Sequence, residues 1–227
     1  MIGRSTVISV ACVGLFLAGA SSAVGQTSDA ERFWGQWRGP DATGVARYGN
    51  PPSEWSETRN IRWKLEIPGR GSASPIVWGD KLFLLTAVPV GEPQPVATAD
   101  AGQQAPAGRG RGGRGGRRGA RARGRRAIPM HRFIVMAIDR ETGEVAWERV
   151  AREEVPHEGH QQPNGTYASG SAVTDGEHLF AFFGSWGLYA YDMDGNPLWE
   201  VDLGTRIMRN GFGEGTTPAL HGNTLVV

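Results

Sequence analysis

A short pattern recurs three times along the chain and limits the folds that the chain can adopt. Each copy has an apolar run, then a Gly beside Asp or Asn, then a second apolar run; the copies lie at 74–83, 171–180 and 217–226. This order is typical of a β-hairpin whose turn contains the Gly and its polar neighbour. Gly and Pro supply 34 and 14 of the 227 residues, a proportion that disfavours long helices. The sequence therefore predicts consecutive antiparallel hairpins.

A second repeat lies between these copies, at 137–147 and again at 190–199. It has an Asp whose carboxylate is expected to accept backbone N–H groups of a turn, and a Gly that supplies the positive φ. A Trp follows, and one indole in each repeat is large enough to pack between neighbouring sheets. The residues with this expected structural role are Asp139, Thr142, Gly143, Trp147, Asp192, Gly195 and Trp199.

Two hairpins in each period form a four-stranded antiparallel sheet, and several such sheets around an axis form a β-propeller. The pattern A-x-D-x-x-T-G-x-x-x-W is complete at 137–147 and lacks one residue at 190–199. It resembles the tryptophan-docking repeat of pyrroloquinoline-quinone (PQQ)-like β-propellers. The segment Trp37-Arg38-Gly39-Pro40 is similar to the opening of exported bacterial members. The family that the repeat resembles includes quinoprotein dehydrogenases and the outer-membrane assembly lipoprotein B of the barrel-assembly machinery. The resemblance implies an all-β propeller of four-stranded antiparallel blades, expected here as an N-terminal fragment with fewer than four blades.

The first 25 residues have the organisation of a signal peptide. Arg4 precedes an uncharged run at 7–20, which is shorter than the roughly 20 residues of a membrane-spanning helix. Small residues then permit cleavage before Gln26. An uncleaved anchor or a buried helix is the alternative. The expected product is periplasmic or extracellular and is not an integral membrane protein after cleavage. It has no thiol for disulfides or nucleophilic catalysis, because the single cysteine, Cys12, lies in the signal.

The composition divides the remaining chain into three parts. We expect an N-terminal segment and first blade region at 26–87, a disordered insert rich in Pro, Gly and Arg at 88–130, and further blades, truncated at the C-terminus, at 131–227. Nine Arg and no acidic residue lie between Arg109 and Arg126, although the formal net charge of the whole chain is only +1. A tolerated surface insertion is one interpretation, and contact with an anionic surface is another. Nucleic acid is disfavoured, because the tract has no aromatic residues and the chain has an export signal.

Two segments contain candidate ligand-binding residues. The loop at 156–164 supplies His157, Glu158 and His160, a plausible set for a transition metal. Its H-E-x-H spacing differs from the helical metalloprotease motif, and a loop held by hydrogen bonds is the alternative. The segment Asp192-Met193-Asp194-Gly195-Asn196 is similar to the start of a calcium loop, but it coincides with the hairpin turn of the repeat and has no closing Glu.

The Gly-rich connection at 209–216 contains the second set of candidates, Asn210 and Glu214. Loops at one end of a propeller converge on its channel, so these residues and the His157 loop are expected to share one face. No catalytic residue is identified. We expect a binding or scaffold module with an envelope protein or glycan partner and no evident cofactor. The alternative implied by the resemblance is a PQQ- and calcium-dependent quinoprotein oxidoreductase acting on alcohols or sugars, although the adjacent cysteines of such enzymes are absent.

Overall fold

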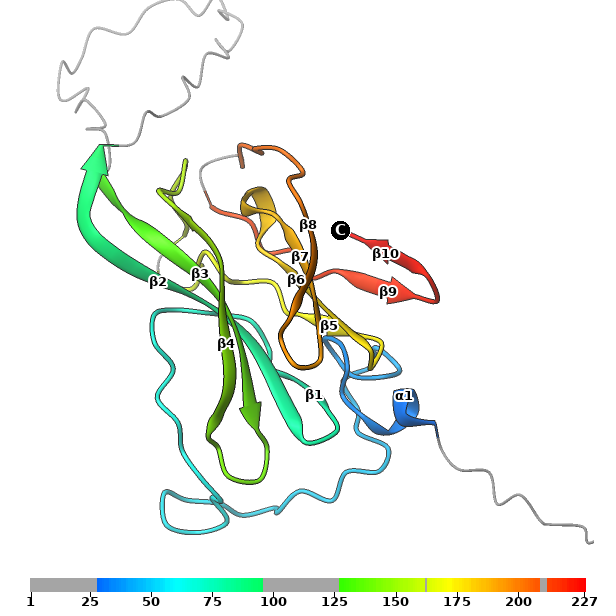
Figure 1. Ribbon diagram of the computed structural model, residues 1–227. Coiled ribbons are helices and arrows are strands. Elements are labelled where there is room, and N and C mark those ends of the chain that lie inside the picture. The colour runs from blue at the N-terminus through cyan, green and yellow to red at the C-terminus, as the bar shows by residue number, and fades with distance from the viewer. Residues whose placement is uncertain (1–27, 96–126, 162, 209–211) are drawn as a thin grey trace, which may run out of the picture.

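The computed structural model describes residues 28–95, 127–161, 163–208 and 212–227 (Figure 1). Within these ranges the chain forms two four-stranded antiparallel sheets, each with its strands in chain order, and one further hairpin. The helical elements are short: α1 (Asp29–Arg32) and the 3-10 turn η1 (Gly184–Trp186). The first sheet contains β1 (Ile76–Trp78), β2 (Lys81–Pro95), β3 (Ala127–Asp139) and β4 (Val145–Glu154). The second contains β5 (Val173–Thr174), β6 (His178–Phe182), β7 (Leu188–Asp192) and β8 (Pro197–Val201). The hairpin consists of β9 (Ala219–His221) and β10 (Thr224–Val226).

The three predicted hairpins are confirmed as β1–β2, β5–β6 and β9–β10. Their turn glycines, Gly79, Gly176 and Gly222, have φ values of 61°, 99° and 52°, in the left-handed region that favours glycine. The strand registers are equivalent, since residues at the same positions of the repeat pair in all three hairpins. These pairs are Ile76 with Phe83, Val173 with Phe180, and Ala219 with Val226. The repeat in the sequence therefore specifies strand register as well as strand identity, and the sheets are propeller blades.

The second repeat forms the β3–β4 and β7–β8 turns. The Oδ1 atom of Asp139 accepts the N–H groups of Glu141 at 2.9 Å and Thr142 at 2.7 Å. In the next blade, the Asp192 carboxylate accepts three N–H groups, the backbone N–H groups of Asp194 and Asn196 and the side-chain amide of Asn196. The segment at 192–196 is thus a hairpin turn whose carboxylate is already occupied by the chain itself.

The tryptophans of the repeat dock on these turns. The Trp63 indole donates to the carbonyl of Arg140 at 2.9 Å, in the β3–β4 turn, and the Trp147 indole donates to the carbonyl of Met193 at 3.1 Å, in the β7–β8 turn. Trp147 on β4 therefore links the first blade to the second. Trp199, its equivalent on β8, contacts Phe180 at a ring distance of 5.8 Å and is 43% exposed.

One apolar core joins the two blades. Phe133 of β3 packs against Trp186 of η1 with ring centroids 5.0 Å apart, and both side chains are almost completely buried. Phe83 and Trp147 of the first blade and Tyr191 of the second lie in the same cluster. Aromatic pairs of this kind contribute about 0.5 to 1.5 kcal/mol each beyond their area. The two blades are thus packed into one structural unit.

The structure corrects two predicted boundaries in the first blade. Strands β2 and β3 extend to a pair between Pro95 and Ala127, so strand structure covers 88–95 and 127–130, which the composition had assigned to the insert. The reason is continued cross-strand pairing, and Ile128 at the end of this ribbon is 5% exposed. Strands β3 and β4 also complete the first blade and do not begin another. Residues 96–126, which include Arg109–Arg126, lie outside the described residues.

The N-terminal segment connects the inner strands of both blades. The Trp34 carbonyl accepts the N–H of Val77 on β1 at 2.8 Å, and the Gly35 carbonyl accepts the N–H of Thr174 on β5 at 2.9 Å. Within the described ranges, no helix has the length and apolar character that crossing a bilayer requires. The predicted signal peptide at 1–25 lies outside these ranges, so that assignment stays a prediction.

Candidate functional site

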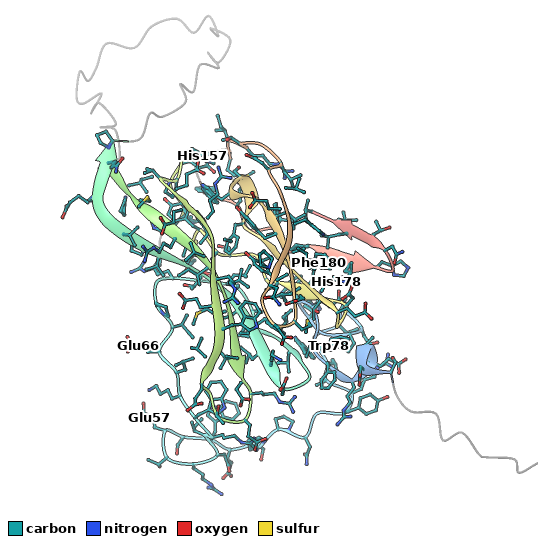
Figure 2. The ribbon with its side chains drawn as sticks, in the orientation of Figure 1. Glu57, Glu66, Trp78, His157, His178 and Phe180 are labelled. Atoms are coloured by element: carbon teal, nitrogen blue, oxygen red, sulfur yellow. The ribbon has the colours of Figure 1, made fainter. Side chains whose placement is uncertain are left out.

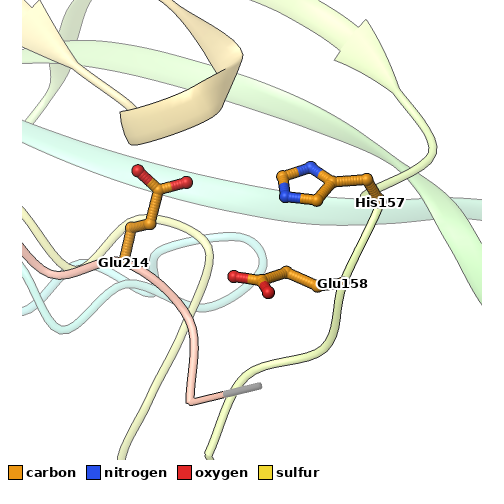
Figure 3. A group of neighbouring side chains, drawn as sticks. All are labelled: His157, Glu158 and Glu214. Carbon is orange, nitrogen blue, oxygen red and sulfur yellow. The ribbon is translucent and has the colours of Figure 1, made fainter. Parts of the chain in front are cut away.

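Three connecting segments meet at one end of the blades and bring together one histidine and two glutamates. The docking turns lie at the opposite end, and His157 marks the end discussed here (Figures 1 and 2). His157 and Glu158 follow β4, whereas Glu214 precedes β9. Their side chains point toward one another, as Figure 3 shows, and one ligand atom from each residue lies within 4.8 Å of the others. None of the three side chains is fully exposed or fully buried.

His157 is held by a ring contact and by a hydrogen bond. Its imidazole packs on the indole of Trp186 with centroids 5.4 Å apart. Its Nε2 atom lies 2.8 Å from the carbonyl oxygen of Arg206. A carbonyl oxygen can only accept, so the neutral imidazole carries its proton on Nε2 and keeps the lone pair on Nδ1. The preceding residue, Pro156, is buried and fixes the start of the loop.

Glu158 has one satisfied and one unsatisfied carboxylate oxygen. Its Oε2 atom accepts the N–H of Met208 at 3.1 Å. Its Oε1 atom is buried and has no hydrogen-bond partner among the described residues. Burial is the main cause that raises the pKa of Glu158, and the charge of Glu214 adds to it; the Met208 hydrogen bond and His157 act in the opposite direction. A buried carboxylate oxygen with no donor is energetically costly and requires an explanation.

Glu214 occupies a space that only a glycine leaves open. Its Oε1 atom accepts the N–H of Ser185 at 3.0 Å. Gly184 has a φ of 65°, and a Cβ atom placed on it would lie 2.6 Å from Oε2 of Glu214. Among the described residues, no Lys or Arg forms an ion pair with Glu214 or with Glu158. Within the described part of the chain, the two carboxylates therefore face each other without an ion-paired Lys or Arg.

His160 lies apart from this group. Its ring meets Tyr167 edge-on with centroids 4.7 Å apart, and His131 contacts the same tyrosine at the same distance. The two histidines and Arg70 help to line a pocket of about 510 Å³ beside the β2–β3 ribbon. Burial is the main cause that lowers the pKa of His131, and nearby His160 lowers it further. Tyr167 connects the pocket to the glutamates, since its hydroxyl donates to the Glu158 carbonyl at 3.1 Å.

The site thus differs in part from the predicted candidates. His157 and Glu158 stay together, Glu214 joins them from the second predicted segment, and His160 is directed elsewhere. Asn210 lies outside the described residues. Sequence reasoning did not identify Gly184, Ser185 and Trp186, which hold Glu214 and His157; a possible indication was the pair of glycines that encloses Ser185 and Trp186 in the sequence.

Comparison with known proteins gives one family. Residues 52–205 and 131–227 match the family model described as outer membrane protein assembly factor BamB, and these ranges together cover most of the chain. No curated protein matches the chain in sequence. The resemblance to PQQ-repeat propellers, inferred from the Asp, Gly and Trp positions, is confirmed by this match.

Proposed function

Because the chain belongs to the PQQ-repeat propeller family of outer membrane protein assembly factor BamB, we propose that it is an exported binding module of the cell envelope. Its partner is an envelope protein that adds an extended segment to the outer edge of the second blade. The observation that carries this proposal is the apolar, exposed character of β8. The family match supports the envelope setting, and the partner is inferred from the strand.

Strand β8 is a suitable edge for strand addition. It pairs with β7 on one side, and its other side has no strand partner among the described residues. All five of its residues are exposed, including Leu198 at 47%, Trp199 at 43% and Val201 at 42%. An unpaired edge offers backbone N–H and C=O groups to an incoming strand, and alternate side chains offer apolar contacts.

The equivalent edge of the first blade has a different character. Strand β4 also has a single strand neighbour, but half of its ten residues are charged, including Glu148, Arg152 and Glu153. Charged side chains on an edge oppose unintended strand pairing. Strand β8 has one charged residue, Glu200, among its five. The contrast between the two edges favours β8 as the binding edge, and it favours a protein segment over a glycan.

The cluster of His157, Glu158 and Glu214 does not favour the cofactor of the alternative function. PQQ is a flat quinone that bears carboxylates, so its binding requires cationic groups and an open aromatic face. The cluster at the blade end instead presents Glu158 and Glu214, and the Trp186 rings are covered by His157, Phe133 and Tyr167. The proposal therefore includes no quinone chemistry.

Site-specific photo-crosslinking of the full chain in cells tests this function. A photoreactive amino acid at position 198 on β8 is expected to capture one envelope protein, identified by mass spectrometry. The matched control is position 150 on β4, because Val150 and Leu198 are exposed to nearly the same extent, 46% and 47%. Equal capture at both positions, or capture at neither, would contradict the proposal.

The oxidoreductase alternative has its own test. The full-length protein is incubated with PQQ and calcium, and the absorbance of bound quinone and dye reduction with alcohols and sugars are measured. We expect no stoichiometric quinone binding and no turnover. Binding together with turnover would replace the binding-module proposal.

A further inference from the structure

We propose that His157, Glu158 and Glu214 bind a divalent transition-metal cation, with zinc as the representative ion. The metal joins the three segments that meet at this end of the blades: the β4–β5 loop, the residues before β9 and, through hydrogen bonds, η1. The site is independent of the β8 edge, so it goes beyond the proposed function.

The charges of the cluster favour a cation. Ligand atoms of Glu158 and Glu214 lie within 4.8 Å of each other, and the described chain supplies no Lys or Arg as a counter-ion. Two carboxylates in partly buried positions are destabilised unless a cation neutralises them. The described hydrogen bonds position the carboxylates but do not compensate their charge.

The buried Oε1 atom of Glu158 is a second, independent indication. Hydrogen bonds from Met208 and Ser185 hold one oxygen of each glutamate. Among the described residues, Oε1 of Glu158 has no hydrogen-bond donor, and the atom is buried. A bound metal would give this oxygen a partner.

The imidazole of His157 is held in one orientation. A hydrogen bond from the ring to a carbonyl or carboxylate is also what orientates most metal-bound histidines. His157 donates Nε2–H to the Arg206 carbonyl and is stacked on Trp186. The hydrogen bond and the ring contact thus orientate the imidazole before any metal arrives.

The spacing of the ligand atoms requires a small closure. They lie within 4.8 Å of one another, and a tetrahedral zinc ion with bonds of about 2.0 to 2.2 Å needs them about 3.4 Å apart. Side-chain rotation supplies a shift of this size. Gly184 leaves room for the Glu214 carboxylate, because a Cβ atom there would lie 2.6 Å from Oε2.

The ligand types select the class of metal. One imidazole nitrogen with two carboxylate oxygens suits zinc or a neighbouring first-row divalent ion, whereas calcium and magnesium prefer oxygen ligands alone. Three protein ligands leave a fourth tetrahedral position for water or for a group from a partner.

Zinc titration of the full chain, followed by calorimetry against a competing chelator, tests the site. We expect one equivalent of zinc to bind, and calcium not to compete. The variants Glu158→Gln and Glu214→Gln are expected to weaken zinc binding about tenfold or more. Both variants can keep their hydrogen bonds, because the amide oxygen of Gln accepts the same N–H groups.

Two control variants separate this site from other histidines. His160→Gln tests the H-E-x-H loop without altering the proposed ligands. His178→Gln removes an exposed histidine that contacts Asp175 at 2.9 Å. Neither control is expected to change the affinity for zinc. Loss of binding in His160→Gln with retention in Glu214→Gln would overturn the proposed ligand set.

A measurement on the unmodified chain covers the case in which a variant does not fold. The amide N–H groups of Met208 and Ser185 bond to the two carboxylates, so zinc is expected to shift their NMR resonances at one equivalent. Absence of stoichiometric zinc binding and of these shifts would overturn the proposal.

Discussion

The Trp147 indole covers Gly195 so closely that a Cβ atom on Gly195 would lie 2.6 Å from Cδ2 of the ring. Gly195 also has a φ of 80°, which a side chain makes unfavourable. The glycine is therefore required twice, once by the turn and once by the tryptophan that crosses from the neighbouring blade.

Replacement of Gly195 separates these two requirements. Gly195→Ala is expected to lower the free energy of unfolding by about 3 kcal/mol or more, because it adds a steric clash to an unfavourable backbone conformation. Gly204→Ala is the matched control: Gly204 has a φ of 79° and nothing within 4 Å of its added Cβ, so we expect a cost of about 1 to 2 kcal/mol. Urea denaturation measures both. Equal losses of unfolding free energy in the two variants would show that the contact between Trp147 and Gly195 does not add to the cost of the substitution.

Removal of the segment at 96–126 tests the role of the arginine tract. Replacing it with an Asn-Gly turn is expected to leave the fold unchanged, because the β2–β3 pairing continues to Pro95 and Ala127. Binding to vesicles with anionic lipids is expected to fall, since nine arginines are removed. Circular dichroism and vesicle sedimentation measure the two effects. Unfolding of the shortened chain would show that the segment is needed for the blade.

The pKa values of two histidines are expected to shift in opposite directions from the ordinary value. The hydrogen bond to Asp175 is the main cause that raises the pKa of His178, whereas burial is the main cause that lowers the pKa of His131. The His178 contribution to stability is present at low pH and is lost as pH rises through its folded-state pKa. The His131 contribution is present at high pH and is lost as pH falls through its folded-state pKa.

NMR titration of the imidazole resonances measures both pKa values. Asp175→Asn is expected to lower the pKa of His178 and to leave that of His131 unchanged, because their causes are separate. A His178 pKa that does not respond to this variant would contradict the assigned hydrogen bond.

The exposed β8 edge also predicts self-association of the purified chain. Leu198→Lys is expected to increase the monomeric fraction measured by sedimentation velocity, because a charge on an edge opposes strand pairing. Val150→Lys on β4 is the control, since that strand is already rich in charge, and it is expected to have little effect. A monomeric unmodified chain would contradict this prediction.

The blades could be predicted from the sequence because their determinants are local. Asp139 and Gly143 act within one turn, and the equivalent pair Asp192 and Gly195 repeats the pattern, so spacing alone identifies both hairpins. The ends of β2 and β3 could not be predicted in this way. Pairing across the long ribbon includes Pro89 and Pro95, and it resumes after a register shift between Val90 and Gln94, although Pro and Gly residues in isolation favour irregular structure.

The candidate site depends on contacts between distant segments, and only part of it was predicted. Nearness in sequence suggested that His160 acts with His157, but its ring packs on Tyr167. Glu214 lies beside His157 in place of His160, because the connection before β9 passes Gly184 and this glycine leaves space for the carboxylate. A contact between segments so far apart along the chain leaves no local pattern in a single sequence.

The hydrogen bonds of Trp34 and Gly35 have a consequence for the order of folding. Trp34 can pair as soon as the nearby Val77 is available, but Gly35 requires Thr174 of the second blade. Contacts of such long sequence separation form late, since the entropy of closing a long loop opposes them. During synthesis from the N-terminus, Gly35 emerges long before its partner does. Closure of this segment across the two inner strands is therefore expected to be a late step of folding, and a chaperone that holds the N-terminal segment would delay it selectively.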